Sequence, residues 1–288
     1  MKNNKALLNE LLTSAEQGSV CAQYSLGAMY RYGIGISKDD EQALLWWLKA
    51  SKQGDAGAQY NIGGMYRHGR GVPQDYEQAV YWYTKAAEKK YAKAQYHLGC
   101  WYLRGRNIPQ DYEKAIYWYT QAAEQGDAAS QWRLGWLNKE GKGISRNHEQ
   151  AVYWYTKAAE QEFTVAQHNL GVMYRHKDDK QAIFWWLKAV EQQDSMYFNK
   201  SELQANLGSM FSRGEGVPQD YEKAFFWWTK AAEKNYARAQ YYLGRMYDLG
   251  EGVPRDYQHA LYWLTKASEQ GMMLAKRRLD AIELEGQQ

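Results

Sequence analysis

The sequence predicts an all-α fold, a right-handed α/α superhelical solenoid of seven tandem helix-turn-helix repeats with a capping helix at each end. Three observations predict it. A glycine preceded by Leu or Ile recurs at spacings of 36 or 37 residues, which is typical of a repeat protein. Apolar residues within each repeat follow helical spacing and do not alternate as in a strand. Only four prolines occur in 288 residues, which favours helices.

The recurring glycines mark the seven repeats. These marker glycines are Gly27, Gly63, Gly99, Gly135, Gly171, Gly208 and Gly244. A tryptophan follows most of them at a constant distance, at Trp46, Trp82, Trp118, Trp154, Trp227 and Trp263, and a shortened loop brings Trp185 forward in the fifth repeat. The repeats are predicted at 22–57, 58–93, 94–129, 130–165, 166–202, 203–238 and 239–274, between an N-terminal capping helix at 1–21 and a truncated C-terminal capping helix at 275–288.

Each repeat carries the signals of two helices, as the second repeat shows. Its first helix has an apolar stripe at Ala58, Ile62, Met65 and Tyr66, positions that share one helix face. Gly69 and Gly71 end this helix, because glycine accepts the left-handed conformation of a C-cap. Asp75 then suits an N-cap, with Gln78 as its capping-box partner. The second stripe lies at Ala79, Trp82, Tyr83 and Ala86.

The marker glycine stands inside the first helix of each repeat. A glycine there costs about 1 kcal/mol relative to alanine, so its recurrence indicates a compensating contact. We expect the missing Cβ to let the first helix pack closely against the recurring tryptophan of the second. Because neither helix can bury its stripe alone, neighbouring repeats must stack into a curved rod.

Composition excludes several classes of protein. Apolar residues make up 45% of the chain and aromatic residues 15%, too many for a disordered protein. No apolar run is longer than six residues, as in Ala43–Leu48, whereas a membrane-spanning helix needs about 20 residues. The net charge of +3 is too even to indicate nucleic-acid binding by itself. No membrane association is predicted.

The sequence lacks the common motifs of catalysis. The sequence contains no Ser-x-x-Lys, Gly-x-Ser-x-Gly, Cys-x-x-Cys or His-Glu-x-x-His, the spacings that carry nucleophilic, redox or zinc chemistry. Its six histidines are scattered. The prediction is therefore a protein that is not an enzyme and has no metal, no cofactor and no small-molecule substrate.

Two segments carry a family resemblance. The pattern LGxMYxxGxGVPQD is clear in Ile62–Asp75 and Leu207–Asp220, and AxYWYxKAA in Ala79–Ala87. These segments resemble the Sel1-like repeat family, a relative of the tetratricopeptide repeat, over roughly residues 20 to 274. The resemblance implies an α/α solenoid that serves as a protein-interaction scaffold and is common in bacteria.

The binding surface is expected on the first helices, which line the concave face in tetratricopeptide-like solenoids. Relative to the marker glycine, positions −3, −2, +1, +4 and +5 form the inward stripe. Lys and Arg outnumber acids there by eight to two, which suits an acidic, extended protein segment. The predicted groove residues are Arg31, Tyr60, Arg67, Tyr96, Arg104, Trp132, Arg133, Trp136, Lys139, Arg175, Arg213 and Arg245.

Three features of the sequence each allow two interpretations. The tyrosines at −3 either contact the partner or pack between adjacent first helices. Trp132 and Trp136 either anchor the partner or fill a wider gap between repeats. The extra residues within Glu191–Gln204, which include Met196, Tyr197 and Phe198, either bend the rod and lengthen a helix or form an apolar tip that docks a partner.

The predicted function is a non-catalytic interaction scaffold that binds a protein partner in its concave groove, and the family resemblance implies a bacterial adaptor or an immunity-type protein. A second hypothesis is a β-lactam-binding or hydrolysing enzyme like the cysteine-rich members of the family. Its weakness is that Cys21 and Cys100 are two repeats apart. A third is nucleic-acid binding through the basic stripe.

The short apolar stretch after Lys5 and the reduced cysteines predict a cytoplasmic location in a bacterium; export stays open for a chain that has lost a leader.

Overall fold

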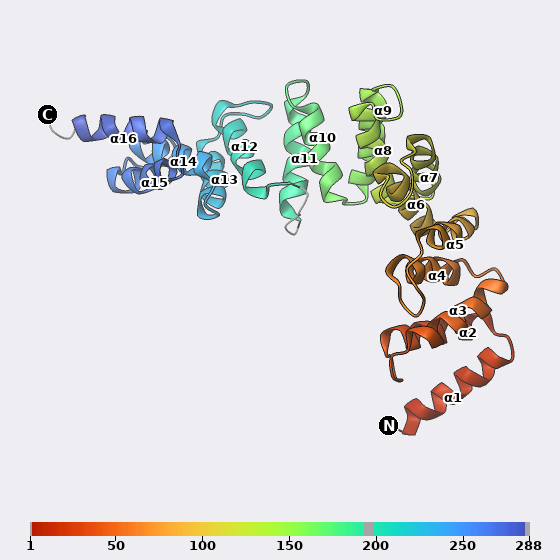
Figure 1. The fold of residues 1–288 in the computed structure, drawn as a ribbon. Coiled ribbons are helices and arrows are strands. Elements are labelled where there is room, and N and C mark those ends of the chain that lie inside the picture. Colours follow the sequence, from red (N-terminus) through yellow and green to blue (C-terminus); the bar gives the residue numbers. More distant parts are fainter. Residues whose placement is uncertain (1, 193–197, 286–288) are drawn as a thin grey trace. The chain divides into compact units, whose positions relative to one another are not determined.

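The computed structural model describes residues 2–192 and 198–285, which form sixteen α-helices and, within those ranges, no strand (Figure 1). The prediction of an all-α solenoid is confirmed. The chain divides into two compact units, Met1–Trp154 and Tyr155–Gln288, so each unit is described by itself.

The helices of the N-terminal unit alternate between the two types that the repeat predicts. After α1 (Lys2–Glu16), the first helices are α2 (Val20–Tyr32), α4 (Ala56–His68), α6 (Ala92–Arg104) and α8 (Ala128–Glu140). The second helices are α3 (Asp40–Lys52), α5 (Tyr76–Glu88), α7 (Tyr112–Glu124) and α9 (His148–Glu160), within which the two units divide. From α1 to α8, each helix packs against the next.

The C-terminal unit continues the alternation. Its first helices are α10 (Thr164–Tyr174), α12 (Lys200–Arg213) and α14 (Ala237–Leu249), and its second helices are α11 (Asp179–Glu191), α13 (Tyr221–Glu233) and α15 (Tyr257–Glu269). The helix α16 (Met273–Glu285) packs on α15. The seven repeats are thus the helix pairs from α2–α3 to α14–α15.

The capping residues act as their sequence predicts. Gly69 ends α4 in the left-handed region (φ 62°, ψ 47°), and its N–H donates to the Met65 carbonyl oxygen. Asp75 caps α5, since its carboxylate accepts a hydrogen bond from the Gln78 N–H at 2.9 Å. Fixed caps at both ends set the helix lengths, which bring the same positions of each repeat to the same face.

The marker glycine permits a close approach, but its neighbour is not the recurring tryptophan. A Cβ on Gly63 would lie 2.9 Å from Cδ1 of Tyr83, one position beyond Trp82, and a Cβ on Gly27 would lie 2.4 Å from Cδ1 of Trp47. The expected pairing of glycine with the recurring tryptophan is therefore wrong. Adjacent helical positions point about 100° apart, so Trp82 turns instead toward the core cluster that contains Trp47.

A buried glutamine joins three helices at several repeat junctions. In the third repeat, Gln95 Nε2 donates to the carbonyl oxygen of Ala87 at 2.9 Å, and Gln95 Oε1 accepts from Gln125 Nε2 at 2.6 Å. The same three-residue arrangement joins Gln23 to Ala15 and Gln53, and Gln240 to Ala232 and Gln270. This glutamine junction links the first helix of a repeat to both neighbouring second helices.

The second repeat breaks the pattern of the glutamine junction. Lys89 occupies the C-cap of α5, where α3 and α7 have Gln53 and Gln125. Gln59 Oε1 is buried and finds no hydrogen-bond partner in the described part of the chain. An unsatisfied buried acceptor costs about 1–3 kcal/mol, so this junction is weaker than the complete ones.

The irregular stretch after the fourth repeat is partly visible. Residues 175–178 alone separate α10 from α11, as the short loop predicts. Residues 193–197, which include Met196 and Tyr197, lie outside the described residues. Phe198 is half-buried and stacks on His168 with ring centroids 4.6 Å apart, and α12 begins at Lys200.

Candidate binding pocket

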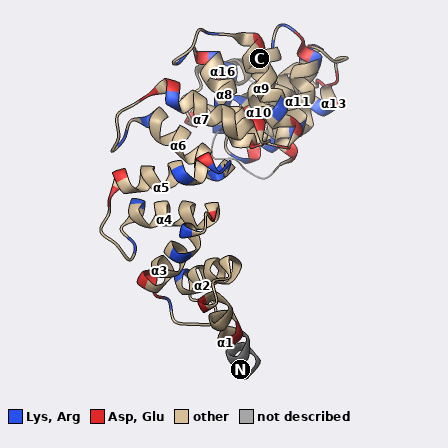
Figure 2. Cartoon of the chain, turned by 90° about the vertical axis from the view of Figure 1, so that its right-hand side faces the viewer, with Lys and Arg blue, Asp and Glu red and all other residues tan. Residues whose placement is uncertain are grey.

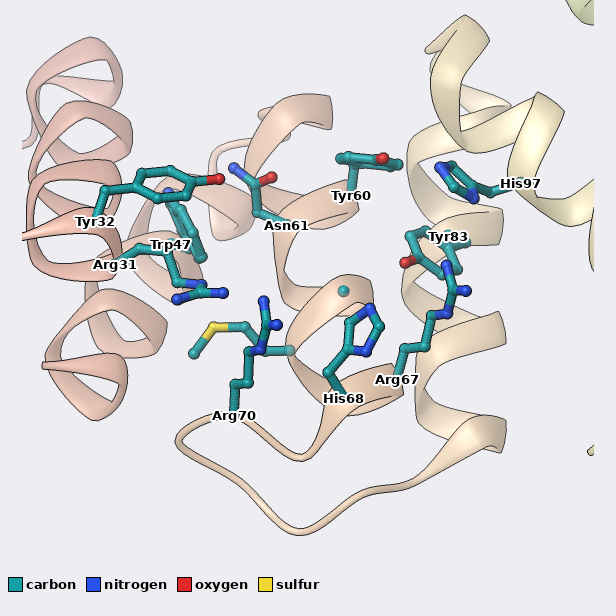
Figure 3. A pocket seen from close by; sticks show the side chains of 12 residues that line it. Arg31, Tyr32, Trp47, Tyr60, Asn61, Arg67, His68, Arg70, Tyr83 and His97 are labelled. Carbon is teal, nitrogen blue, oxygen red and sulfur yellow. The ribbon is translucent and has the colours of Figure 1, made fainter. Parts of the chain in front are cut away.

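A pocket of about 280 Å³ opens on the first-helix side of the N-terminal unit (Figure 3). Its walls come from α2, α4 and α6, with Trp47 of α3 and Tyr83 of α5 behind them. Arg70 adds a wall from the loop between α4 and α5. The helix caps of three successive repeats therefore position the pocket.

Cationic side chains surround this pocket. Figure 3 shows Arg31, Arg70 and His68 projecting into the same hollow, with Arg67 beside Tyr83. Arg31 Nη1 pairs with Asp40 Oδ1 at 3.2 Å. Over residues 2–192 and 198–285, no carboxylate lies within ion-pair distance of Arg67 or Arg70. Acidic and basic residues are interspersed over the rest of the chain (Figure 2), so this positive charge is local.

Aromatic rings form the inner wall of the pocket. Tyr60 lies 5.4 Å from Tyr83 and 5.6 Å from His97, measured between ring centroids, and Tyr83 stacks on His97 at 5.8 Å. The guanidinium of Arg67 lies 5.6 Å from the ring centroid of Trp101. These contacts hold Tyr60 between two neighbouring first helices, so the tyrosine packs between helices and also lines the pocket.

The two histidines and two of the tyrosines of the pocket have pKa values shifted toward their neutral forms. Burial, followed by the charge of Arg67, lowers the pKa of His97 to about 4. Partial burial and the charges of Arg67, Arg70 and Arg31 lower the pKa of His68. Burial raises the pKa of the Tyr60 phenol to about 12 and also raises the pKa of Tyr83. At neutral pH the pocket therefore combines guanidinium charges with neutral imidazole and phenol donors.

Most of the pocket comes from the five positions that the sequence singled out. Eight lining residues occupy them: Arg31, Tyr32, Tyr60, Asn61, Gly64, Arg67, His68 and His97. Of the predicted groove residues, the structure brings Arg31, Tyr60 and Arg67 together in this pocket.

Two predicted residues meet in a second cluster instead. Arg133 and Tyr96 lie beside the buried Cys100, whose Sγ accepts a hydrogen bond from the Tyr119 hydroxyl at 3.3 Å. Burial, followed by the neighbouring Cys100, raises the pKa of Tyr96 to about 12, and the charge of Arg133 opposes this. The Arg133 guanidinium also lies 4.3 Å from the ring centroid of Trp132, so part of its role is packing.

The fourth-repeat tryptophans belong to the protein interior more than to its surface. Trp132 is 9% exposed, and Trp136 packs against the cluster that contains Leu134 and Leu137. Lys139 pairs with Glu140 at 3.3 Å. Arg104 is exposed at the end of α6 and does not line the pocket.

The predicted arginines of the C-terminal unit are mostly neutralised. Arg175 pairs with Asp179 at 2.9 Å and also with Glu215, which Arg213 approaches at 3.4 Å. Arg245 is half-buried on α14, and it forms no ion pair in the part of the chain that the structure describes. These side chains do not reproduce the cationic pocket of the N-terminal unit.

Sequence reasoning left Arg70, Tyr83, Trp47 and Met65 out of the groove positions. Arg70 belongs to the loop after α4, and Tyr83 belongs to a second helix, so neither lies on the predicted stripe. A usable signal was present for Arg70, because it stands between the two glycines of a tight loop that returns toward its own helix.

Other kinds of site were considered. Cys21 and Cys100 are both free. Among the described residues, no group of His, Cys, Asp and Glu side chains has an arrangement that could hold a metal ion. None of the helices in the same residues has the length and apolar character needed to span a bilayer.

Comparison with known proteins establishes the family. The Sel1 repeat model matches residues 22–55, 56–91, 92–127, 128–163, 164–194, 201–236 and 237–272. The chain belongs to the Sel1 repeat family. A Sel1 repeat fold is typically a non-catalytic scaffold for protein interactions. No curated protein matches the chain.

Two solved Sel1 structures resemble the chain over nearly all its length. One is c5321 of uropathogenic Escherichia coli, described as a protective antigen, with 35% identity over 97% of this chain and a TM-score of 0.70. The other is a Sel1 repeat protein of Oxalobacter formigenes, with 33% identity over 96% of this chain, 79% of the other chain and a TM-score of 0.66. This chain spans 60% of the length of the Escherichia coli protein.

Proposed function

We propose that this Sel1 repeat protein is a non-catalytic scaffold, of the adaptor or immunity type, that binds an acidic, extended segment of a partner protein. The binding surface lies on the first-helix side of the N-terminal unit and centres on the pocket around Arg67. The observation that carries the proposal is the absence of any carboxylate within ion-pair distance of Arg67 or Arg70 in the described residues.

The chemistry of the pocket supports an anionic partner. Guanidinium groups bind carboxylates through paired hydrogen bonds, and a carboxylate from another chain supplies what the fold itself leaves out. The rings of Tyr60, Tyr83 and His97 add contact area with few rotatable bonds. They are already fixed by their mutual contacts, so binding costs little side-chain entropy.

The test is fluorescence anisotropy with a short, labelled, glutamate-rich peptide at low salt. The double variant Arg67→Glu/Arg70→Glu reverses two charges of the pocket and is expected to weaken binding by about tenfold or more. Circular dichroism should show unchanged helicity, because Arg70 is exposed in a loop and Arg67 is only half-buried in the pocket wall.

The control reverses one charge elsewhere on the second repeat. Lys85 is exposed on α5, does not line the pocket, and lies 4.8 Å from the ring centroid of Tyr81. Lys85→Glu is expected to change the affinity by less than about twofold. Equal losses in the pocket variant and in Lys85→Glu would reject the assigned surface, as would no loss in either.

A further inference from the structure

The charge of the pocket exceeds what one carboxylate can neutralise. Arg31, Arg67 and Arg70 contribute three positive charges, and Asp40, which pairs with Arg31, contributes one negative charge. Three minus one leaves two positive charges on the walls of a single cavity. Lys38 also approaches Asp40, at 3.7 Å, which increases the excess. The charge that complements this pocket is at least that of a dianion.

The pocket is also rich in hydrogen-bond donors. Besides the arginines, it is lined by Tyr32, Tyr60, Tyr83 and Asn61, whose side chains can donate hydrogen bonds. The phenols of Tyr60 and Tyr83 stay protonated because burial raises the pKa of each. A tetrahedral oxyanion offers several acceptor oxygens in different directions, which matches donors that approach from α2, α4, α5 and the loop before α5.

The size of the pocket indicates that the anion carries an organic group. The pocket, with a volume of about 280 Å³, has room beyond a phosphate ion, which has five heavy atoms. The remaining space borders the rings of Tyr60, Tyr83 and His97. A ligand that fills it has a charged head at the arginines and an uncharged body against the rings.

We propose that this pocket binds the dianionic head of a phosphomonoester, with Arg31, Arg67 and Arg70 around the phosphate. The proposal deepens the proposed function, on which it rests, by naming the anionic group that the partner presents. A phosphorylated side chain carries a charge of about −1.5 to −2 at pH 7 and three acceptor oxygens, whereas a carboxylate carries one charge and two oxygens.

The first experiment separates charge from shape. Isothermal titration calorimetry at low salt compares phenyl phosphate, a dianion, with phenyl sulfate, a monoanion of the same tetrahedral shape. We expect phenyl phosphate to bind about tenfold tighter or more. Equal affinity for the two compounds, or no binding of phenyl phosphate, overturns the proposal.

The second experiment uses a matched pair of arginines. Arg70 and Arg106 stand at the same place in the loops of the second and third repeats, and both are exposed, but only Arg70 lines the pocket. Arg70→Gln is expected to weaken phenyl phosphate binding by about tenfold, and Arg106→Gln by less than about twofold. Equal effects of the two substitutions overturn the assignment to this pocket.

A third comparison identifies the source of the phosphate. It uses a short phosphoserine peptide, the same peptide without phosphate, and inorganic phosphate. Tighter binding of the phosphopeptide than of inorganic phosphate supports a phosphorylated protein segment. Similar affinity for both supports a small phosphate ester. Binding of the unphosphorylated peptide as tightly as the phosphopeptide overturns the proposal.

The two proposals fail in different ways. If the glutamate-rich peptide binds in a manner that depends on Arg67 and Arg70 while phenyl phosphate does not bind, the scaffold function stands and the phosphate assignment fails. If phenyl phosphate binds and no acidic peptide does, the phosphate site stands and the acidic-segment proposal fails.

Discussion

The second and seventh repeats have the same pair of helices, but their equivalent side chains have different roles. At the fourth position after the marker glycine, the second repeat has Arg67 and the seventh has Asp248. Asp248 is fully buried and pairs with Arg278 of α16 through two contacts of 2.6 and 3.1 Å. Arg67 is half-buried in a pocket wall and has no carboxylate partner in the described residues.

The glutamine junctions of these two repeats also differ, in whether the glutamine Oε1 has a hydrogen-bond partner. Gln240 Oε1 accepts from Gln270 at 2.6 Å in the seventh repeat, whereas Gln59 Oε1 has no hydrogen-bond partner in the described residues of the second. The seventh repeat thus satisfies its polar groups internally. The second repeat leaves Gln59 Oε1 without a partner, as the fifth and sixth repeats leave Gln167 Oε1 and Gln204 Oε1 among the described residues.

The largest effect is expected when Arg278 of α16, the partner of Asp248, loses its charge. Arg278→Met strands Asp248 as an uncompensated buried carboxylate, which costs about 3–5 kcal/mol. We expect a lower urea midpoint by circular dichroism and faster hydrogen exchange in residues 273–282. Adding Asp248→Leu removes the stranded charge and should recover most of the loss. A single variant as stable as the wild type would show that the pair contributes nothing.

Acid should destabilise the pocket region through His97. Its pKa of about 4 in the folded chain lies below the ordinary value of about 6.5, so between these values the unfolded state binds a proton that the folded state lacks. Stability is then full above about pH 6.5 and falls as the pH drops toward 4, by at most about 3 kcal/mol. Urea unfolding at pH 7.5 and 4.5 measures this loss.

His97→Asn is the control for the pH dependence. Asn occupies the equivalent position in the second, fifth and sixth repeats, at Asn61, Asn169 and Asn206, so the frame accepts it. The variant should show a smaller loss of stability between the two pH values than the wild type. An identical pH dependence in the variant would assign the effect to other groups.

Completing the glutamine junction of the second repeat should make it resemble the seventh. Lys89 and Gln125 have similar backbone angles at their C-caps (φ −81°, ψ 16° and φ −84°, ψ 2°), so Lys89→Gln can donate to Gln59. We expect a gain of about 1 kcal/mol in the free energy of unfolding, measured with urea. Lys93→Gln, an exposed change of the same charge on α6, should be neutral; a gain there too would indicate a general charge effect.

The smallest effect on stability is expected at Arg67 itself. Arg67→Met removes a cation that contacts Trp101 but leaves no buried carboxylate behind, so the cost should stay below about 1 kcal/mol. Binding of the glutamate-rich peptide should nevertheless fall. A loss of stability as large as that of Arg278→Met would mean that Arg67 holds the fold together.

The repeating parts of the fold were predictable because their signals are local. Gly69 and Asp75 mark a helix end and a helix start through residue types that favour left-handed and capping conformations. The neighbour of Gly63 was mispredicted by one position, since Trp82 and Tyr83 are both aromatic and the repeat pattern does not tell which ring faces the glycine. The glutamine junctions depend on contacts between residues 30 apart, which no local pattern reveals.

The positions of the residues that line the candidate site were more predictable than the net charge of the site. The stripe positions brought Arg31, Tyr60 and Arg67 into one pocket. The same rule selected Arg175, whose charge is balanced by Glu215 of a loop 40 residues further along the chain. Whether an arginine stays available depends on such distant carboxylates, and a stripe read along one helix does not include them.

The glutamine junction also bears on how such a chain gains and loses copies. In the third repeat, Gln95 takes its acceptor from a main-chain carbonyl, which any preceding helix offers, and its donor from Gln125 of the same repeat. Such a repeat suits tandem duplication, because an added copy brings both of its glutamines and the preceding helix supplies the carbonyl. The second repeat, with Lys89 in place of that donor, would pass on its defect each time it was copied.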